Sequence, residues 1–237
     1  MEGTTIFLGS GDSYNINYMT VMASQYIVSV GGVYTNLGNS GQIRSQCAWY
    51  CPPGNWYGGA LGSGGGNSYF FNLPSYQHSS LISVPSNITN RGEPDISMPS
   101  ANLITNYQGQ FITGSGTSYA TPITAGAFAD IESFLASKMN NSNLRLGWIQ
   151  PILYSLGYHS YYGYDAFFKV SNLQSGFWSN SRKYLGSGWN SHVGIGSLHA
   201  YNLAKDIMNY LEMPNPSLFF EKQIDSNNVN ITWIKND

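Results

Sequence analysis

Two short segments hold the residue types that nucleophilic catalysis uses. Ser118 lies in "SGTSYATP", after a Gly-Thr pair and before small, apolar residues, and Asp12 lies in "GSGDS", after an apolar run. A serine attacks when a base takes its proton, and the oxyanion formed then needs hydrogen-bond donors. A plain helix N-cap remains open for Ser118, and an ordinary turn residue for Asp12.

A base for Ser118 is not evident among the histidines. The chain has His78, His159, His192 and His199, and only His78 precedes the serine. His78 lies in "SYQHSS", beside no glycine turn that would present it to a site, and is interpreted as a packing or surface residue. A Ser-His-Asp triad is therefore not supported.

The surrounding segments predict strands and helices in alternation. "TTIFLGSGD" and "YIVSVGG" are short apolar runs stopped by glycine, as in buried parallel strands. Residues 118–138 predict a helix with Pro122 in its first turn, and "GWIQPILYSLGY" predicts a second. Alternation of this kind predicts an α/β fold with a parallel sheet. A third helix in "SLHAYNLAKDIMNYL" would pack one face on the core through Leu198, Tyr201, Ala204, Met208 and Leu211.

Composition narrows the class of protein. The 237 residues are enough for one substantial core. Charged residues make up 9% of the chain, against roughly 25% in an average domain, and the net charge of −2 disfavours a nucleic-acid partner. No apolar run is long enough to span a membrane. For Cys47 and Cys51, a disulfide and two free thiols both remain open.

Several segments resemble, in order, the motifs of the sedolisins, which are serine-carboxyl peptidases. "SGTSYATP" matches S-G-T-S-x-x-x-P, and "GSGDS" is similar to the S-G-D-S turn. "RGEPDIS" resembles R-G-x-P-D-V-S, and "GWNSHVGIGSLHAYNLA" resembles G-W-D-P-x-T-G-x-G-S-x-N. The 106 positions between Asp12 and Ser118 are also sedolisin-like, and longer than the interval in subtilisins.

The resemblance implies a subtilisin-like parallel sheet flanked by helices. It implies a peptidase domain over residues 1–211, followed at 212–237 by a tail or the start of a β-rich segment. Ser118 would be the catalytic nucleophile in peptide-bond hydrolysis at acidic pH. The oxyanion hole would be the Ser118 amide and the Asp12 carboxyl, which donates only when protonated. Asp95 is interpreted as structural.

One departure from the family concerns the base. In sedolisins a glutamate, oriented by an aspartate one helical turn away, lies well upstream of the S-G-D-S turn. The carboxylates that cannot be mapped onto that pair are Glu2, Glu93, Asp95, Asp130 and Glu132. We therefore expect an incomplete domain, the C-terminal portion of the peptidase domain, inactive alone and completed by an upstream segment. The alternatives are a catalytically inactive binding module at a cell surface and a subtilisin-type hydrolase.

A second departure concerns calcium. The positions that match the family's calcium ligands are Lys169, Val170, Gly186, Gly188 and Asn190, so both carboxylates are replaced. Calcium prefers carboxylate oxygens, and an ammonium would oppose it. We expect no cofactor and no metal. The expected partner is a peptide or protein substrate, and the expected location is extracellular or at the cell surface, in an acidic environment.

Overall fold

The computed structural model describes residues 3–14, 23–51, 61–78, 88–158, 165–168, 170 and 188–212, together with the backbone of strands 219–223 and 229–233. Its main sheet has six strands. In spatial order these are β1 (Ile6–Gly9), β2 (Ile27–Leu37), β8 (Ile96–Pro99), β12 (Ser197–Leu198) and β11 (Phe167–Phe168), with β3 (Ile43–Ala48) also paired to β2.

The central strands of this sheet are parallel. β1 pairs with β2, β2 with β8, and β8 with β12 in the same direction, whereas β3 and β11 run antiparallel to their neighbours. Because the strands are parallel, the turns after β1 and β8 leave the sheet at the same end. The chain that follows β1 and the chain that follows β8 therefore begin at the same end of the sheet.

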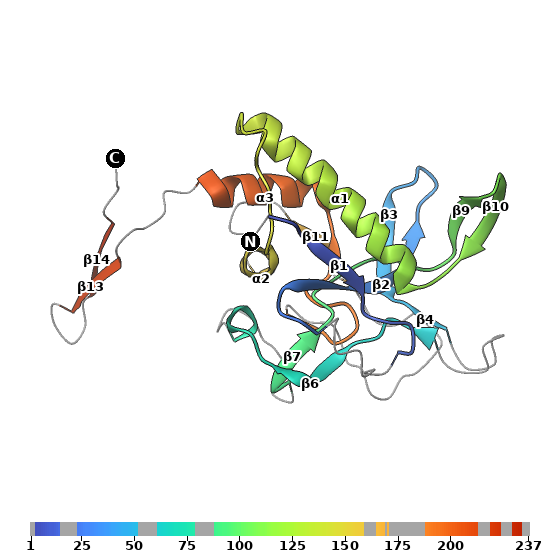
Figure 1. Ribbon diagram of the computed structural model, residues 1–237, viewed down its shortest axis with the longest axis horizontal. Helices are drawn as coiled ribbons and strands as arrows, with labels where there is room; N and C mark the ends of the chain where they lie inside the picture. The colour runs from blue at the N-terminus through green and yellow to red at the C-terminus, as the bar shows by residue number, and fades with distance from the viewer. Residues whose placement is uncertain are drawn as a thin grey trace.

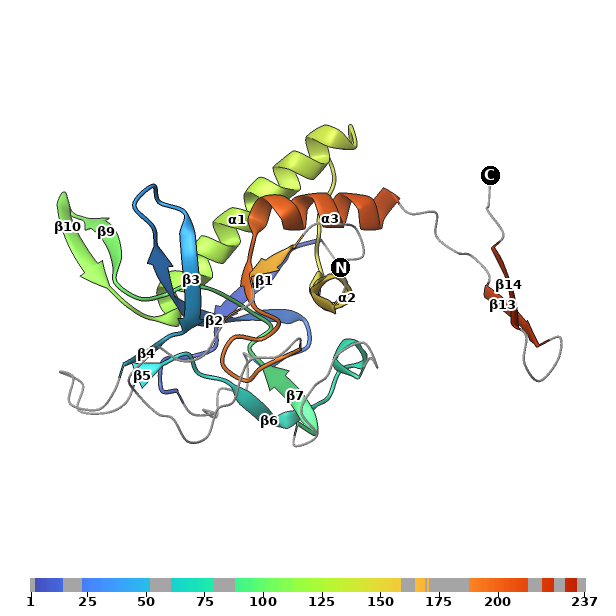
Figure 2. The same ribbon diagram turned by 180° about the vertical axis from the view of Figure 1, so that it is seen from behind.

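Helices cover one face of the sheet. α1 (Thr117–Lys138) and α3 (Ala200–Glu212) pack against each other there, as Figure 1 shows, and the smaller sheet of β6 and β7 lies on the opposite side. The view from behind in Figure 2 gives the same arrangement. The core between α1 and the sheet includes Val28, Val30, Ile96, Phe128 and Leu135. The predicted α/β fold is confirmed.

The remaining elements are short. α2 (Gln150–Tyr158) contributes Leu153 to the main core and Tyr154 to a second cluster with Tyr76 and Trp189. A 3-10 helix, η1, spans Ser75–Gln77. The two-stranded antiparallel sheets pair β4 (Tyr50–Cys51) with β5 (Leu61–Gly62), β6 (Gly66–Asn72) with β7 (Asn90–Glu93), β9 (Leu103–Tyr107) with β10 (Gln110–Gly114), and β13 (Phe219–Gln223) with β14 (Val229–Trp233).

Three local expectations about the third helix were wrong. Leu198 lies in β12, before α3 begins, and Tyr201 and Leu211 are 58% and 38% exposed. Ala204 is buried as expected, but the other buried residues of α3 are Leu203, Asp206 and Ile207. The buried face of α3 therefore lies to one side of the face that the pattern predicted.

Pro122 lies in the second turn of α1 rather than in the first. The helix begins at Thr117, so Pro122 is an interior position. A proline has no N–H to donate to the carbonyl four residues earlier, which here belongs to Ser118.

In the part of the chain that the structure describes, every helix is too short or too polar to traverse a lipid bilayer.

Candidate active site

Asp12 lies in the turn that leaves β1. The Ser10 N–H donates to the Val30 carbonyl at 2.8 Å and so extends the pairing of β1 with β2 by one residue. The chain then turns at Gly11, whose φ of +96° favours glycine. The Asp12 carbonyl accepts from the N–H of Gly62 at 2.8 Å. The turn is therefore held from both sides, and Asp12 has a defined position.

Ser118 is the second residue of α1. The N-cap is Gly116, which has a φ of +149° and offers no side-chain cap, so the plain N-cap interpretation of Ser118 was wrong. Its side chain is exposed, and its main-chain N–H makes no hydrogen bond within the described residues. The first N–H groups of a helix are orphan donors at the positive end of its dipole. Ser118 thus combines an accessible hydroxyl with an available donor.

Two contacts bring the start of α1 to the end of the sheet. The Gly116 N–H donates to the carbonyl of Ser100, which follows β8, at 2.7 Å. On the other side, a Cβ on Gly9 at the end of β1 would lie 2.8 Å from Thr117 Oγ1. Only a glycine at position 9 lets the first turn of α1 approach this closely.

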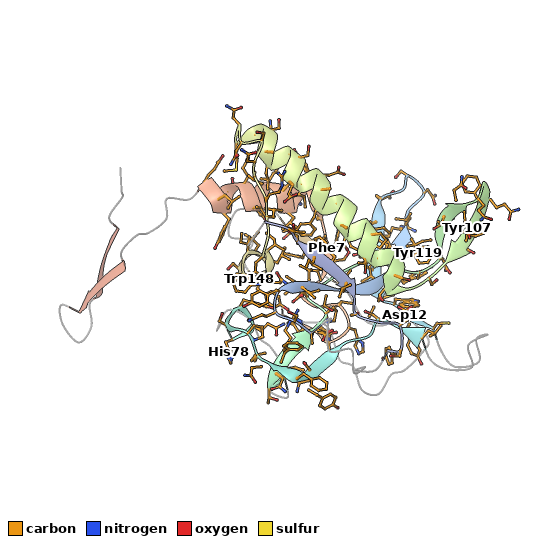
Figure 3. The ribbon with its side chains drawn as sticks, viewed as in Figure 1. Phe7, Asp12, His78, Tyr107, Tyr119 and Trp148 are labelled. Carbon is orange, nitrogen blue, oxygen red and sulfur yellow. The ribbon has the colours of Figure 1, made fainter. Side chains whose placement is uncertain are left out.

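Asp12 and the start of α1 are joined directly. Asp12 Oδ1 accepts from the Thr117 N–H and from the Thr117 hydroxyl, each at 2.8 Å. A Cβ on Gly116 would lie 2.9 Å from Asp12 Oδ2 and 3.0 Å from Ser118 Oγ. The two oxygens therefore flank one small volume beside Gly116. Figure 3 shows Asp12 beside the first turn of α1.

This arrangement suits the stabilisation of a negative oxygen. Ser118 supplies a hydroxyl and an N–H at a helix N-terminus, where anions are favoured. Asp12 Oδ2 lies on the same side and becomes a donor when the carboxyl is protonated. Such a set resembles the donors that stabilise the oxyanion of acyl transfer.

The described histidines bond elsewhere. His192 Nδ1 lies 3.2 Å from the Ser63 carbonyl, and His199 Nδ1 accepts from the Asn202 N–H at 3.4 Å. His78 is exposed and lies well apart from Asp12, as Figure 3 shows. His159 lies outside the described residues. No triad histidine is therefore present among the described residues.

The acidic residues other than Asp12 that the sequence analysis considered also offer no base beside Ser118. Asp130 and Glu132 lie on α1 roughly 20 Å further along the helix axis, at about 1.5 Å per residue. Glu132 Oε1 accepts from the Leu146 N–H at 2.8 Å. Glu93 and Asp95 lie around the start of β8, at the end of the sheet opposite to Ser100. Glu2 lies outside the described residues.

Asp95 belongs to a buried network. Its Oδ2 accepts from Arg91 Nη2 at 2.6 Å and from the Ser29 N–H at 2.9 Å. Its Oδ1 accepts from the Tyr154 hydroxyl at 2.9 Å. Arg91 and Asp95 are both fully buried, so this ion pair is shielded from water. Beside it, burial raises the pKa of Glu93 to about 7, opposed by Arg91 and assisted by Asp95. The geometry supports the structural interpretation of Asp95.

Two features of interest were missed from the sequence. Thr117 makes both of the contacts that hold Asp12 Oδ1, and its only signal was its place between Gly116 and Ser118. Asp206 is buried in α3, and neither of its carboxyl oxygens has a hydrogen-bond partner within the described part of the chain. Burial, and then the charge of Asp165, raise its pKa to about 6.

Of the positions matched to calcium ligands, the structure describes Val170, Gly188 and Asn190. Asn190 Oδ1 already accepts from the His192 N–H at 2.8 Å, and the Asn190 and Gly194 backbones bond each other in the same turn. Lys169 and Gly186 lie outside the described residues. Groups of three or more His, Cys, Asp or Glu side chains that could hold a metal are absent from the described residues.

Cys47 and Cys51 are not joined by a disulfide bond. Cys47 lies in β3, where burial raises the pKa of its thiol, and Cys51 lies in β4. The sequence left a disulfide and two thiols open, and the structure has no disulfide between these residues.

Comparison with known proteins gives one consistent relationship. Residues 7–177 match the Subtilase family. Kumamolisin from Bacillus sp. (strain MN-32) is 27% identical over 213 residues, which are 82% of this chain and 35% of that protein. Sedolisin from Pseudomonas sp. (strain 101) is 29% identical over 205 residues, covering 82% and 30%. Tripeptidyl-peptidase 1 from Dictyostelium discoideum is 29% identical over 189 residues, covering 73% and 27%.

A solved structure shows the same fold. It is Pseudomonas sedolisin, a serine-carboxyl proteinase, complexed with two molecules of pseudo-iodotyrostatin. The TM-score is 0.69 at 24% identity, and the match covers 87% of this chain and 56% of that one. The chain spans about a third or less of the length of the curated relatives that it matches.

Proposed function

This chain belongs to the subtilase family and is related to the sedolisins, and on that premise we propose that it carries the nucleophile and the oxyanion hole of a serine-carboxyl peptidase. Its relatives are peptidases, so a peptidase-like function is the coarse conclusion. The finer proposal assigns Ser118 as nucleophile, and Asp12 with the Ser118 amide as oxyanion donors. The substrate is a peptide or protein.

One observation carries this proposal. Asp12 Oδ2 and Ser118 Oγ lie 2.9 and 3.0 Å from the same point, which is where a Cβ on Gly116 would be. The two residues come from segments 106 positions apart in the chain. A carbonyl carbon attacked by the serine would place its oxygen within reach of the carboxyl.

The reaction would proceed by acyl transfer. Ser118 Oγ bonds to the carbonyl carbon while a base takes its proton, and the carbonyl oxygen becomes negative. That oxygen accepts from the Ser118 N–H and from the protonated Asp12. The base then gives its proton to the leaving amine as the C–N bond breaks, and water releases the acyl group by the same steps. Because Asp12 must be protonated, activity is expected in acid.

The base would come from outside the described residues. α1 leaves room for it, because Ser118 shares an exposed, small-residue helix face with Pro122, Ala125, Gly126 and Ala129. A Cβ on Gly126 would meet no atom within 4 Å. A further helix could pack closely on this face and bring a carboxylate to the hydroxyl.

Calcium has no part in this mechanism. Asn190 and Lys169 replace the two carboxylates that the family uses, and Asn190 Oδ1 is occupied within its own turn. The residue types at these positions therefore do not fit the ion. An acidic, extracellular or cell-surface location is consistent with the low content of charged residues and with an acid-dependent donor.

A catalytically inactive binding module is the second candidate. It is favoured by a single observation, the lack of a base beside Ser118 among the described residues. Such a module would keep the fold and the exposed α1 face and bind peptides without cleaving them.

A cleavage assay separates the two candidates. Peptide hydrolysis would be measured across the range from acid to neutral pH on the full-length gene product and on its Ser118→Ala variant. Ser115→Ala is the matched control, since Ser115 is also exposed and its hydroxyl accepts from the Asn102 N–H at 2.9 Å. We expect hydrolysis in acid that Ser118→Ala reduces by a factor of roughly 10³ or more and Ser115→Ala preserves. Equal hydrolysis by wild type and Ser118→Ala would contradict the proposal.

A further inference from the structure

The hydrogen bonds of Thr117 have a direction that chemistry decides. Its Oγ1 lies 3.2 Å from the Gly11 nitrogen and 2.8 Å from Asp12 Oδ1. A main-chain N–H can only donate, so Gly11 gives its hydrogen to Oγ1. The Thr117 hydroxyl donates its one hydrogen to Asp12 Oδ1, because an ionised carboxylate oxygen can only accept.

Asp12 Oδ1 therefore receives two hydrogens from one residue. The Thr117 N–H donates to it at 2.8 Å, in addition to the hydroxyl. Thr117 is 3% exposed, so water does not compete for these bonds. A proton on Oδ1 would point at donors and would break at least one of the two bonds.

We propose that Thr117 is a positioning residue that decides which oxygen of Asp12 carries the proton. With Oδ1 held as the acceptor, the protonated carboxyl has its hydroxyl on Oδ2, and Oδ2 is the oxygen that flanks the space beside Ser118 Oγ. The inference rests on the proposed function for its catalytic meaning. Its structural content, the location of one proton, holds whether or not the chain cleaves peptides.

The arrangement has a physical reason. A neutral carboxyl facing water can place its proton on either oxygen, and half of those states would present an acceptor to the oxyanion. Two donors on Oδ1, each contributing a net hydrogen bond, would bias the choice by roughly tenfold or more. The oxyanion donor is then in place before the substrate binds, which is the preorganisation that electrostatic catalysis requires.

Infrared spectroscopy of the carboxyl group tests this in solution. The C=O band of protonated Asp12 would be isolated in acid as the difference between wild type and Asp12→Asn. The same difference would be taken in a Thr117→Val background, which removes the hydroxyl, and in a Thr117→Ser background, which keeps it. Circular dichroism would confirm that each variant is folded, and Thr117→Ala replaces Thr117→Val where valine is not tolerated.

We expect the band to move to higher wavenumber in Thr117→Val, because its C=O group loses a hydrogen bond, and to return to the wild-type position in Thr117→Ser. An unchanged band in Thr117→Val would overturn the proposal. Atomic-resolution diffraction of the wild type in acid needs no variant. A Cγ–Oδ2 bond longer than Cγ–Oδ1 supports the proposal, and the reverse or equal lengths overturn it. Neither readout depends on hydrolysis, so loss of the peptidase assignment would be recognised separately by the cleavage assay.

Discussion

Asp12 Oδ1 lies 2.8 Å from both the main-chain nitrogen and the hydroxyl of Thr117, although the two residues are 105 positions apart. These bonds join the turn after β1 to the first turn of α1. Because Ser118 follows Thr117, they also set the nucleophile against the carboxyl.

Replacing Asp12 by asparagine should change the pH range of hydrolysis. The introduced amide would keep an oxygen for the Thr117 donors and place an N–H where the carboxyl hydroxyl lies. An amide does not titrate in this range, so activity should persist toward neutral pH where wild type has lost it. Asp12→Ala removes the donor and should lower kcat by about 10²–10³ in acid, where the wild-type carboxyl is the donor. If Asp12→Asn lost its activity at the same upper pH as wild type, the assignment of Asp12 as an oxyanion donor would be contradicted.

Adding one methyl group beside the two oxygens should abolish activity. In Gly116→Ala the new carbon would meet Asp12 Oδ2 at 2.9 Å and Ser118 Oγ at 3.0 Å, and a φ of +149° is unfavourable for alanine. Gly11→Ala is the matched control, because Gly11 also has a positive φ but a Cβ there meets nothing within 4 Å. At equal folded fraction, kcat/KM should fall much further in Gly116→Ala. Equal losses would show that backbone strain alone is responsible.

Breaking the buried ion pair should destabilise the fold without altering the site. Asp95→Ala leaves the Arg91 guanidinium buried and uncompensated, which should lower the free energy of unfolding by about 3–5 kcal/mol. Asp130→Ala, at an exposed position of α1, should change it by less than about 0.5 kcal/mol. Urea denaturation measures both. A loss in Asp95→Ala no larger than in Asp130→Ala would refute the structural role of Asp95.

Two buried carboxyls should favour the folded state in acid. Burial raises the pKa of Glu93 to about 7 and that of Asp206 to about 6, with Asp165 adding to the second shift. The folded state therefore holds protons that the unfolded state releases above about pH 4. The stabilisation is complete below that pH and is lost as the pH rises through about 6 to 7.

Neutral analogues reveal this contribution. Urea midpoints of wild type, Glu93→Gln and Asp206→Asn would be compared at about pH 4 and about pH 8, on either side of the shifted pKa values. Between the lower and the higher pH, the free energy of unfolding should fall in wild type by on the order of 1–3 kcal/mol more than in each variant. Parallel pH dependence in wild type and both variants would show that neither carboxyl is responsible.

Calcium should neither stabilise the chain nor bind near Asn190. The carboxylate positions are occupied by Lys169 and Asn190, and Asn190 Oδ1 caps the His192 N–H. The melting temperature should therefore be the same in millimolar calcium and in a chelator. A crystal soaked in calcium that shows an ion within coordination distance of Asn190 would defeat this prediction.

The sequence predicted the structure best where a motif requires a particular backbone conformation. Glycine turns after apolar runs located β1 and the Asp12 turn, and the Gly-Thr-Ser segment located the start of α1 closely. Parallel pairing of neighbouring strands then brings such turns together, so the proximity of Asp12 and Ser118 could be anticipated.

Side-chain orientation could not be anticipated in the same way. The role of Thr117 depends on which of two oxygens its hydrogen atoms reach, and residue type does not determine this. The buried face of α3 depends on its packing against α1 and α2, and Leu198 lies in β12 rather than in this helix. Burial of Asp206 contradicts the usual exposure of carboxylates, and the state of Cys47 and Cys51 depends on strand geometry.

The most direct measurement is a crystal structure of the full-length product with a peptide aldehyde, which mimics the carbonyl under attack. The account predicts a tetrahedral adduct on Ser118 Oγ, with its oxygen about 2.7–3.1 Å from Asp12 Oδ2 and from the Ser118 nitrogen. An adduct oxygen pointing away from Asp12, or an aldehyde bound at another residue, would contradict it.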